Sequence, residues 1–313
     1  MGKNFVAEEI DGEIVVWGGV QRQPDSSYVN LPPDLVFVYH PPDDFWRVIP
    51  ATGDIPSHSV HCASAVVDQL LFVFGGVNRN NEMTNEIHSF CLSTGVFRRL
   101  PVQGLRPAPR RSLQGWSYEG QLYFFGGGRT EAAGETYLPA PASKYKQDNL
   151  LACFDPQTHS WTAVETTGPP PSPRQDYAAA QLEDVVIIHG GDCEKGIMDS
   201  MFELNLTTRT WRQVEWKAWL GLCLCNHSLV TISPKHLLLT GGYTGSISNQ
   251  VGKYDASKAQ WTKLNMLSPD LSKSVHHHRA VAVKAEQGII VVVLGGQGPD
   301  FMHPSQMLVF HVE

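Results

Sequence analysis

The sequence has little charge and no long apolar run, and both absences narrow the class of protein. Only 18% of the 313 residues are charged, and the formal net charge is −7. Nucleic-acid binding depends on clustered Lys and Arg, and the sequence has no basic run. The longest apolar run, IIVVVL from Ile289, is far shorter than the ~20 residues that span a bilayer. We therefore expect neither a nucleic-acid partner nor a membrane span.

Cysteine is also scarce, and the N-terminus has none of the signals that would direct the chain to a membrane or out of the cell. The six cysteines do not form the dense pattern of a disulfide framework. The start, MGKNFVAEEI, is too polar for a signal peptide, and Val6 stands where N-myristoylation requires Ser or Thr. We expect a cytoplasmic and/or nuclear protein whose cysteines are reduced thiols.

Glycine is plentiful, and its placement reveals a repeat. Six apolar runs each end in a Gly pair: EIVVWGG, LLFVFGG, QLYFFGG, VVIIHGG, HLLLTGG and IIVVVLGG. Their first glycines are 57, 51, 64, 51 and 54 residues apart, close to the ~50-residue period of kelch repeats. A short run that is apolar at every position indicates a strand covered on both faces. The Gly pair allows a sharp turn or a close backbone approach.

Three further strands are expected around each apolar run. One precedes it, as in HCASAVVD, and one follows the Gly pair, as in EIHSFCL and NLLACFD. The last opens on an aromatic residue that should fill the wedge between neighbouring sheets. These aromatic residues are Trp46, Phe97, Trp161, Trp211 and Trp261.

Four strands per unit and six units predict an all-β, six-bladed kelch β-propeller that forms a single domain. The expected blades cover about residues 1–52, 53–103, 104–167, 168–217, 218–267 and 268–313. The last blade should lack its outer fourth strand, which leaves the edge Met307 to Val312 unpaired. Three explanations stay open: a shortened form of a longer protein, a strand donated by a partner, or a three-stranded blade.

The middle of the chain resembles one family of kelch proteins. The segments are RPAPRRSLQGWSYEGQLYFFGG from Arg106, DNLLACFDPQTHSW from Asp148, and GGDCEKGIMDSMFELNLTTRTW from Gly190. They are similar to the small kelch-domain-containing substrate receptors of cullin-RING ubiquitin ligases. The resemblance implies a central pocket that holds the C-terminal end of a substrate protein, and a ligase-binding box after the propeller.

The sequence departs from that family at the positions that the resemblance marks as functional. Asp192 and Ile197 stand where the family has two degron-binding arginines, and Cys225 and Asn226 replace its Ser-Trp pair. A pocket tryptophan is replaced by Gln147, and no ligase-binding box is evident. We therefore expect neither diglycine recognition by the family's chemistry nor direct recruitment of a ligase.

Candidate binding residues lie in loops just before or at the start of the expected inner strands. An arginine there suits an acidic or C-terminal protein segment, because guanidinium forms bidentate bonds with carboxylates. The alternative is that these arginines bond backbone carbonyls and hold neighbouring blades together. The candidate peptide-binding residues are Arg110, Arg111, Arg174, His227, Arg279, His61 and Tyr145. We expect Arg110, Arg174 and Arg279 to face the axial channel from matching positions.

Metal and catalytic sites are not expected. Adjacent strand residues point to opposite faces, so His276, His277 and His278 cannot converge on one ion. Cys223, Cys225 and His227 share a face but fall short of the four ligands of a structural zinc. The Glu194 and Asp199 region lacks the His of iron-binding kelch proteins, and no nucleophile elbow is present. The sequence predicts a protein-binding module without a cofactor, not an enzyme.

The longest insertion, from Gly128 to Gln147, is either a surface excursion or a lid over the binding surface. We favour the lid. Tyr137, Lys144 and Tyr145 are its candidate ligand contacts.

Overall fold

The computed structural model describes residues 2–23, 25, 27–131, 136–138, 147–217, 223–264, 275–286, 288–298 and 307–312. The regular structure of these residues is β-strand apart from a 3-10 helix, η1 (Pro41–Asp43). The chain divides into two compact units. We call Asn4–Glu165 with Ser172–Gln175 the N-terminal unit, and Met1–Lys3, Thr166–Pro171 and Asp176–Glu313 the C-terminal unit. A single domain remains a prediction.

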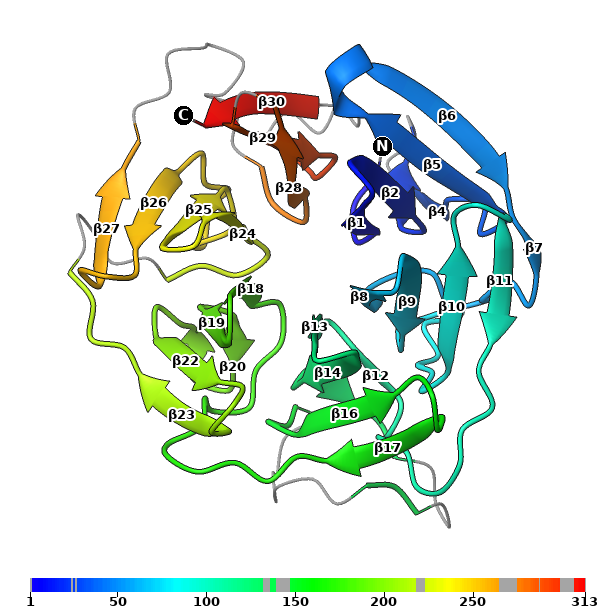
Figure 1. Ribbon diagram of the computed structural model, residues 1–313, viewed down its shortest axis with the longest axis horizontal. Helices are drawn as coiled ribbons and strands as arrows, with labels where there is room; N and C mark the ends of the chain where they lie inside the picture. Colours follow the sequence, from blue (N-terminus) through cyan, green and yellow to red (C-terminus); the bar gives the residue numbers. More distant parts are fainter. Residues whose placement is uncertain are drawn as a thin grey trace. The chain divides into compact units, whose positions relative to one another are not determined.

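The N-terminal unit holds three meandering antiparallel sheets (Figure 1). The first is β1 (Val6–Ile10), β2 (Glu13–Trp17), β5 (Leu35–His40) and β6 (Phe45–Pro50). The second is β8 (Ala63–Val67), β9 (Leu70–Phe74), β10 (Ile87–Cys91) and β11 (Val96–Arg99), with β7 (Thr52–Gly53) added in parallel to β11. The third is β13 (Gln114–Tyr118), β14 (Gln121–Phe125), β16 (Leu151–Asp155) and β17 (Ser160–Ala163).

The C-terminal unit repeats the same meander (Figure 1). Its first sheet is β18 (Ala178–Leu182), β19 (Val185–His189), β22 (Met201–Asn205) and β23 (Thr210–Gln213). The next is β24 (Ser228–Ser233), β25 (His236–Thr240), β26 (Val251–Asp255) and β27 (Gln260–Lys263). The last is β28 (Arg279–Ala285), β29 (Gly288–Leu294) and β30 (Met307–Val312), so it has three strands within the described residues, as predicted.

Three two-stranded ribbons are present in addition to the six larger sheets of the described residues. They are β3 (Val20–Arg22) with β4 (Tyr28–Asn30), β12 (Arg110–Arg111) with β15 (Gly128–Arg129), and β20 (Asp192–Cys193) with β21 (Gly196–Ile197). In each ribbon, one strand begins directly after a Gly pair; these strands are β3, β15 and β20. We call the end of each sheet at which the Gly pair lies its Gly-pair end.

The second strand of each sheet is the predicted apolar run, and its centre is buried. Leu71 to Phe74 in β9 and Val186 to His189 in β19 are at most 3% exposed. The Gly pairs then make the close approach that was predicted. In each pair the second glycine has a φ between 89° and 106° and donates its N–H to a carbonyl just ahead of another sheet's inner strand. Gly76 reaches Arg110 in this way at 2.8 Å, and Gly242 reaches Val275 at 2.7 Å.

Aromatic side chains fill the space between neighbouring sheets of a unit, as predicted. Phe97 of β11 is fully buried and contacts Trp17 of the first sheet, with ring centroids 5.3 Å apart. Trp161 of β17 lies 4.6 Å from Phe74 of the second sheet. Trp46 differs, because it is partly exposed and its ring packs on Tyr39 of its own sheet at 4.8 Å.

The connecting segments protect the outer sheet edges, which the sequence analysis did not foresee. Thr52 and Gly53 pair in parallel with β11, and single residues form parallel bridges to β17, β23 and β27. Those residues are Gln103, Thr167 and Lys217. Four sheets thus have a covered outer edge, and the second sheet has five strands instead of four. Within the described residues β30 pairs with β29 alone.

Candidate functional site

Hydrogen bonds define equivalent positions at the start of each inner strand. The inner strand is the first strand of each sheet. The residue two positions before the first residue of each inner strand has a positive φ, and we call it the entry residue. Entry residues bond in series within a unit: His61 N–H donates to the carbonyl of Asn4 at 3.1 Å, and Asn226 N–H to that of Asp176 at 2.8 Å. The six entry residues are Asn4, His61, Ser112, Asp176, Asn226 and His277. They lie at the Gly-pair ends of the sheets.

This alignment corrects one expectation about the arginines. Arg110 and Arg174 both precede an entry residue by two positions, and the second glycine of a Gly pair donates to each backbone carbonyl. Arg279 follows its entry residue, His277, by two positions and is the first residue of β28, opposite Leu294. The three arginines are therefore not equivalent, because Val275 occupies the position of Arg110 and Arg174 in the last sheet, where its carbonyl accepts the N–H of Gly242.

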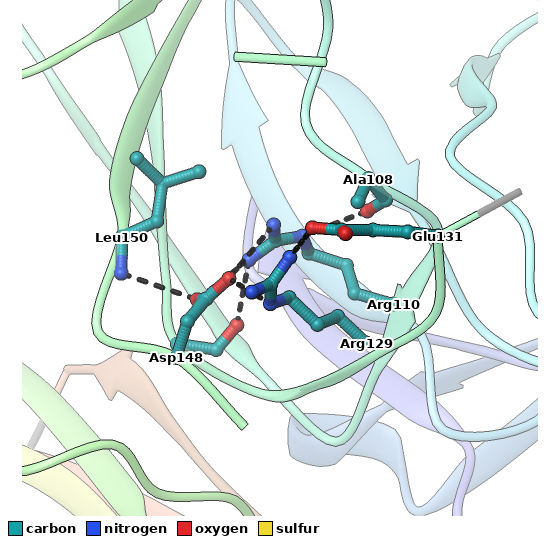
Figure 2. A network of polar contacts seen from close by, with 7 residues as sticks. Ala108, Arg110, Arg129, Glu131, Asp148 and Leu150 are labelled. Atoms are coloured by element: carbon teal, nitrogen blue, oxygen red, sulfur yellow. Dashed lines mark hydrogen bonds and ion pairs between the residues drawn. The ribbon is translucent and has the colours of Figure 1, made fainter. Parts of the chain in front are cut away.

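Arg110 is a buried structural residue (Figure 2). Its side chain is 2% exposed, and it donates to the carbonyls of Ala108 at 3.0 Å and Gly126 at 2.9 Å. It also pairs with the fully buried carboxylate of Asp148 at 3.2 Å. Arg129 pairs with the same carboxylate at 3.2 Å and with Glu131. The guanidinium of Arg110 thus has the partners that the structural alternative predicted.

Arg174 is placed in the same way. It is 1% exposed, and its Nε donates to the carbonyl of Ser172 at 3.1 Å. Nη2 bonds the hydroxyl of Ser172 at 3.2 Å. Because both buried arginines are enclosed by protein, we leave them out of the candidate surface.

The partly exposed candidates of the N-terminal unit are Arg111 and His61. Arg111 donates to the side-chain oxygen of Asn81 at 3.1 Å, which is an exposed contact. His61 lies 3.1 Å from the Ser112 hydroxyl. Arg111 and His61 therefore place a cation and an imidazole at the Gly-pair ends of neighbouring sheets.

The C-terminal unit gathers a different polar group at its Gly-pair ends. Cys225 and Tyr243 exchange backbone hydrogen bonds at 3.1 and 2.9 Å, and Tyr243 packs on His276, with ring centroids 5.9 Å apart. Burial, followed by the charge of Lys3, lowers the pKa of His276 to about 4. Burial, followed by the carboxylate of Asp176, raises the pKa of Cys225 to about 11. The imidazole and the thiol are therefore both neutral near pH 7.

His227 is buried rather than ligand-facing. It is 5% exposed, and its Nε2 lies 3.0 Å from Nδ1 of His189, the residue before Gly190. His278 occupies the equivalent position in the last sheet, where its Nε2 lies 2.7 Å from the Thr240 hydroxyl. Burial lowers the pKa of His278 to about 3 and that of His227 well below its usual value, with neighbouring charges adding to both shifts. Both imidazoles are neutral packing residues between sheets.

Other expectations concern cysteine, metal and the insertion. All six cysteines are free thiols. Across the described ranges, no group of three or more His, Cys, Asp or Glu side chains could hold a metal ion.

Tyr145 and Lys144 lie outside the described residues, so the candidate role of Tyr145 stays a prediction. Tyr137 is partly buried.

Comparison with known proteins decides the family. The sequence profile of the KLHDC2/KLHL20/DRC7 Kelch-repeats domain matches residues 4–220 and 140–296. The chain belongs to this kelch-repeat family. Its fold is therefore an all-β kelch propeller, and the six sheets within the described residues agree with six blades.

The alignments with similar proteins cover almost the whole of this chain. Kelch domain-containing protein 2 of Bos taurus is 28% identical over 95% of this chain and 78% of its own length. Kelch domain-containing protein 1 of Homo sapiens is 25% identical, over 97% of this chain and 79% of its own length. The solved structure of YjhT has a TM-score of 0.76 at 17% identity and covers 100% of this chain and 95% of its own, which shows the fold alone.

The kelch family's degron-binding positions, as implied by resemblance, form a small ribbon in this chain. Asp192 of β20 pairs with Ile197 of β21 just after the Gly pair at Gly190. Neither residue supplies a cation. The charge of Asp192 adds to the factors that raise the pKa of Cys225, so the neighbourhood is acidic. This part of the surface is poorly suited to a terminal carboxylate.

One pocket was missed by sequence reasoning. A cavity of about 640 Å³ in the N-terminal unit lies near the Gly-pair end of its second sheet. Its lining residues are Asp54, Glu86, Ile87, Arg99, Leu100, Pro101, Val102, Gly104 and Arg106. The residues come from three separate segments, which no local sequence pattern connects. Within the described residues, no helix is long and apolar enough to cross a membrane.

Proposed function

We propose that this kelch protein is a non-enzymatic binding module that holds a segment of another protein at the Gly-pair ends of its sheets. The observation that carries the proposal is the contrast between Arg110 and Arg111. Arg110 is locked in the interior by two carbonyls and Asp148, whereas its neighbour Arg111 reaches the surface beside Asn81. The buried residue makes the loop rigid, and a rigid loop loses little entropy when a ligand binds to the exposed one.

The chemistry of the surface favours a segment with both polar and acidic groups. Arg111 can form charge-assisted bonds with a carboxylate, and His61 can bond a peptide carbonyl or amide. Arg279, partly exposed at the start of β28, is a candidate contact in the C-terminal unit. An entirely acidic ligand is disfavoured there, because Asp176 and Asp192 would repel it.

The test is a screen of displayed peptides, with internal segments and free C-termini as separate pools, against the purified chain. The affinity of selected peptides is then measured for Arg111→Glu. Lys235→Glu is the matched control, because Lys235 is exposed in the β24–β25 turn at the opposite end of its sheet. We expect Arg111→Glu to weaken binding about tenfold or more, in line with loss of a charge-assisted bond, and Lys235→Glu to leave it unchanged. Equal affinities for the two variants would contradict the proposal.

A second candidate function is recognition of protein C-termini as a substrate receptor of a cullin-RING ubiquitin ligase. The family membership and the length of the match to kelch domain-containing protein 2 favour it. The side chains of Asp192 and Ile197 argue against the family's diglycine chemistry. Terminal selectivity that disappears when the peptide is amidated would favour this candidate over internal-segment binding.

A further inference from the structure

The cavity near the second sheet has the size and composition of a ligand pocket. About 640 Å³ lies within the usual 300 to 1,000 Å³ range of such pockets. One wall is apolar: Ile87 is fully buried, and Leu100 and Val102 pack on the core between the second and third sheets. Pro101 completes this wall. The remaining lining side chains carry charges of both signs.

Three of the four charged groups already have partners. The guanidinium of Arg99 pairs with Glu86 at 2.8 Å, and the backbone N–H of Arg99 donates to a carboxylate oxygen of Asp54 at 3.2 Å. His88 lies 3.9 Å from Glu86, and burial lowers its pKa, so it adds no charge near pH 7. These contacts hold in place the two carboxylates of the pocket, those of Glu86 and Asp54.

Arg106 is the exception. Its half-buried guanidinium makes no hydrogen bond or ion pair with the residues that the structure describes, although it lines the cavity. Its backbone carbonyl accepts the N–H of Leu138 at 2.9 Å, which holds the segment in place. A partly desolvated cation beside an apolar wall is stabilised by a single anion.

We propose that this pocket is a second peptide-binding site, which takes a carboxylate on Arg106 and an apolar side chain against Leu100 and Val102. A carboxylate fits better than a phosphate, because Arg106 is the one lining cation without a partner among the described residues, and the two lining carboxylates would repel a dianion. The lining of this pocket does not include Arg111, Asn81 or His61, so the proposal does not depend on the function proposed for the surface around Arg111. The carboxylate is either an acidic side chain or a chain end.

The experiment uses the full chain and an array of acetylated, amidated ten-residue peptides with one fixed Leu and one fixed Glu. A twin pool replaces Glu by Gln, a third has no acidic residue but a free C-terminus, and a fourth replaces Glu by phosphoserine. We expect capture of the Glu pool, or of the free C-terminus pool, to exceed capture of the Gln pool about tenfold. Which of the two is captured identifies the source of the carboxylate.

The variants locate the interaction. Arg106→Gln should abolish the preference, Arg106→Lys should keep part of it, and Arg106→Glu should reverse it toward Lys-containing peptides. Arg98→Gln is the matched control, because Arg98 is an exposed arginine on β11 that does not line the cavity. Unfolding midpoints of the variants, measured in parallel, should match the unmodified chain, because the Arg106 side chain has no hydrogen-bond or ion-pair partner among the described residues.

Several outcomes would overturn the proposal. They are capture of neither the Glu pool nor the free C-terminus pool above that of the Gln pool, an unchanged preference in Arg106→Gln, and stronger capture of the phosphoserine pool. A preference that is lost in Arg111→Glu but kept in Arg106→Gln would assign the carboxylate to the other surface. If Arg111→Glu does not weaken peptide binding while Arg106→Gln abolishes the carboxylate preference, the function proposed for the Arg111 surface is contradicted and the proposal for this pocket still holds.

Discussion

Arg110 and Arg111 are adjacent in the sequence and have opposite environments. The Arg110 side chain is enclosed with Asp148, whereas Arg111 reaches solvent beside Asn81. The sequence predicted that arginines would lie at these junctions and offered both a binding and a structural explanation. It could not choose between them, because Asp148 lies 38 residues away and reaches Arg110 only through the fold.

Replacing Asp148 by Asn tests the buried network at residue scale. The carboxylate is fully buried, accepts hydrogen bonds from Arg110 and the N–H of Leu150, and forms an ion pair with Arg129. Removing its charge leaves the buried guanidinium of Arg110 uncompensated, so we expect the free energy of unfolding to fall by about 3 to 5 kcal/mol. Urea denaturation measures it. Asp11→Asn, in an exposed turn, should change it by less than about 0.5 kcal/mol. A cost below about 1 kcal/mol for Asp148→Asn would mean that Arg110 is not held by this carboxylate.

The buried histidines predict how stability depends on pH. The pKa of His278 is about 3 in the folded chain, below its unfolded value of about 6.5. The unfolded state therefore binds the proton first, so stability is complete above about pH 6.5 and falls as the pH decreases toward 3. For His278 alone we expect a loss of about 2 kcal/mol between pH 7 and pH 5.

The double variant His278→Leu with Thr240→Val isolates this contribution. Leu is the residue at the equivalent position in the third sheet, Leu113, where it is buried. Denaturant unfolding at pH 7 and pH 5 should show that the variant loses about 2 kcal/mol less than the unmodified chain over this interval. An identical loss in both proteins would rule out His278 as the titrating group.

At the scale of secondary structure elements, the second strands and the Gly pairs could be read from the sequence almost completely. EIVVW and LLFVF are apolar throughout and form β2 and β9, and their Gly pairs have positive φ. The parallel bridges at Gln103 and Thr167 could not be predicted, because a lone residue pairing with a distant strand leaves no periodic pattern. The predicted packing between sheets is wrong for Trp46, whose ring packs within its own sheet.

Two glycines of the first sheet separate backbone strain from steric contact. Gly18 has a φ of 74°, and an added Cβ would lie 2.3 Å from the Ser59 carbonyl oxygen; Gly12 has a φ of 81° with nothing within 4 Å. We expect Gly12→Ala to cost about 1 kcal/mol from the positive φ alone, and Gly18→Ala to cost at least about 2 kcal/mol more. Thermal or urea unfolding of both variants measures the difference. Equal costs would mean that the Gly pair is needed for its turn and not for the close approach to the neighbouring sheet.

At the scale of the whole molecule, six repeats of one pattern, a matching kelch profile and six sheets in the described residues agree. The repeat was predictable because each sheet needs cover on both faces, which imposes the same apolar run on every unit. The binding chemistry was less predictable, since fold does not dictate function. The pocket with Arg106 draws on segments that come together only after the sheets have packed.

Hydrogen exchange with a library-selected peptide tests most directly whether the Gly-pair ends bind protein segments. Our account predicts slower amide exchange in the bound state at Asn78 to Glu82 and around His61 and Arg111, and unchanged exchange in the opposite turns at Asp68 and Glu119. Protection of the opposite turns, with none at the Gly-pair ends, would contradict it.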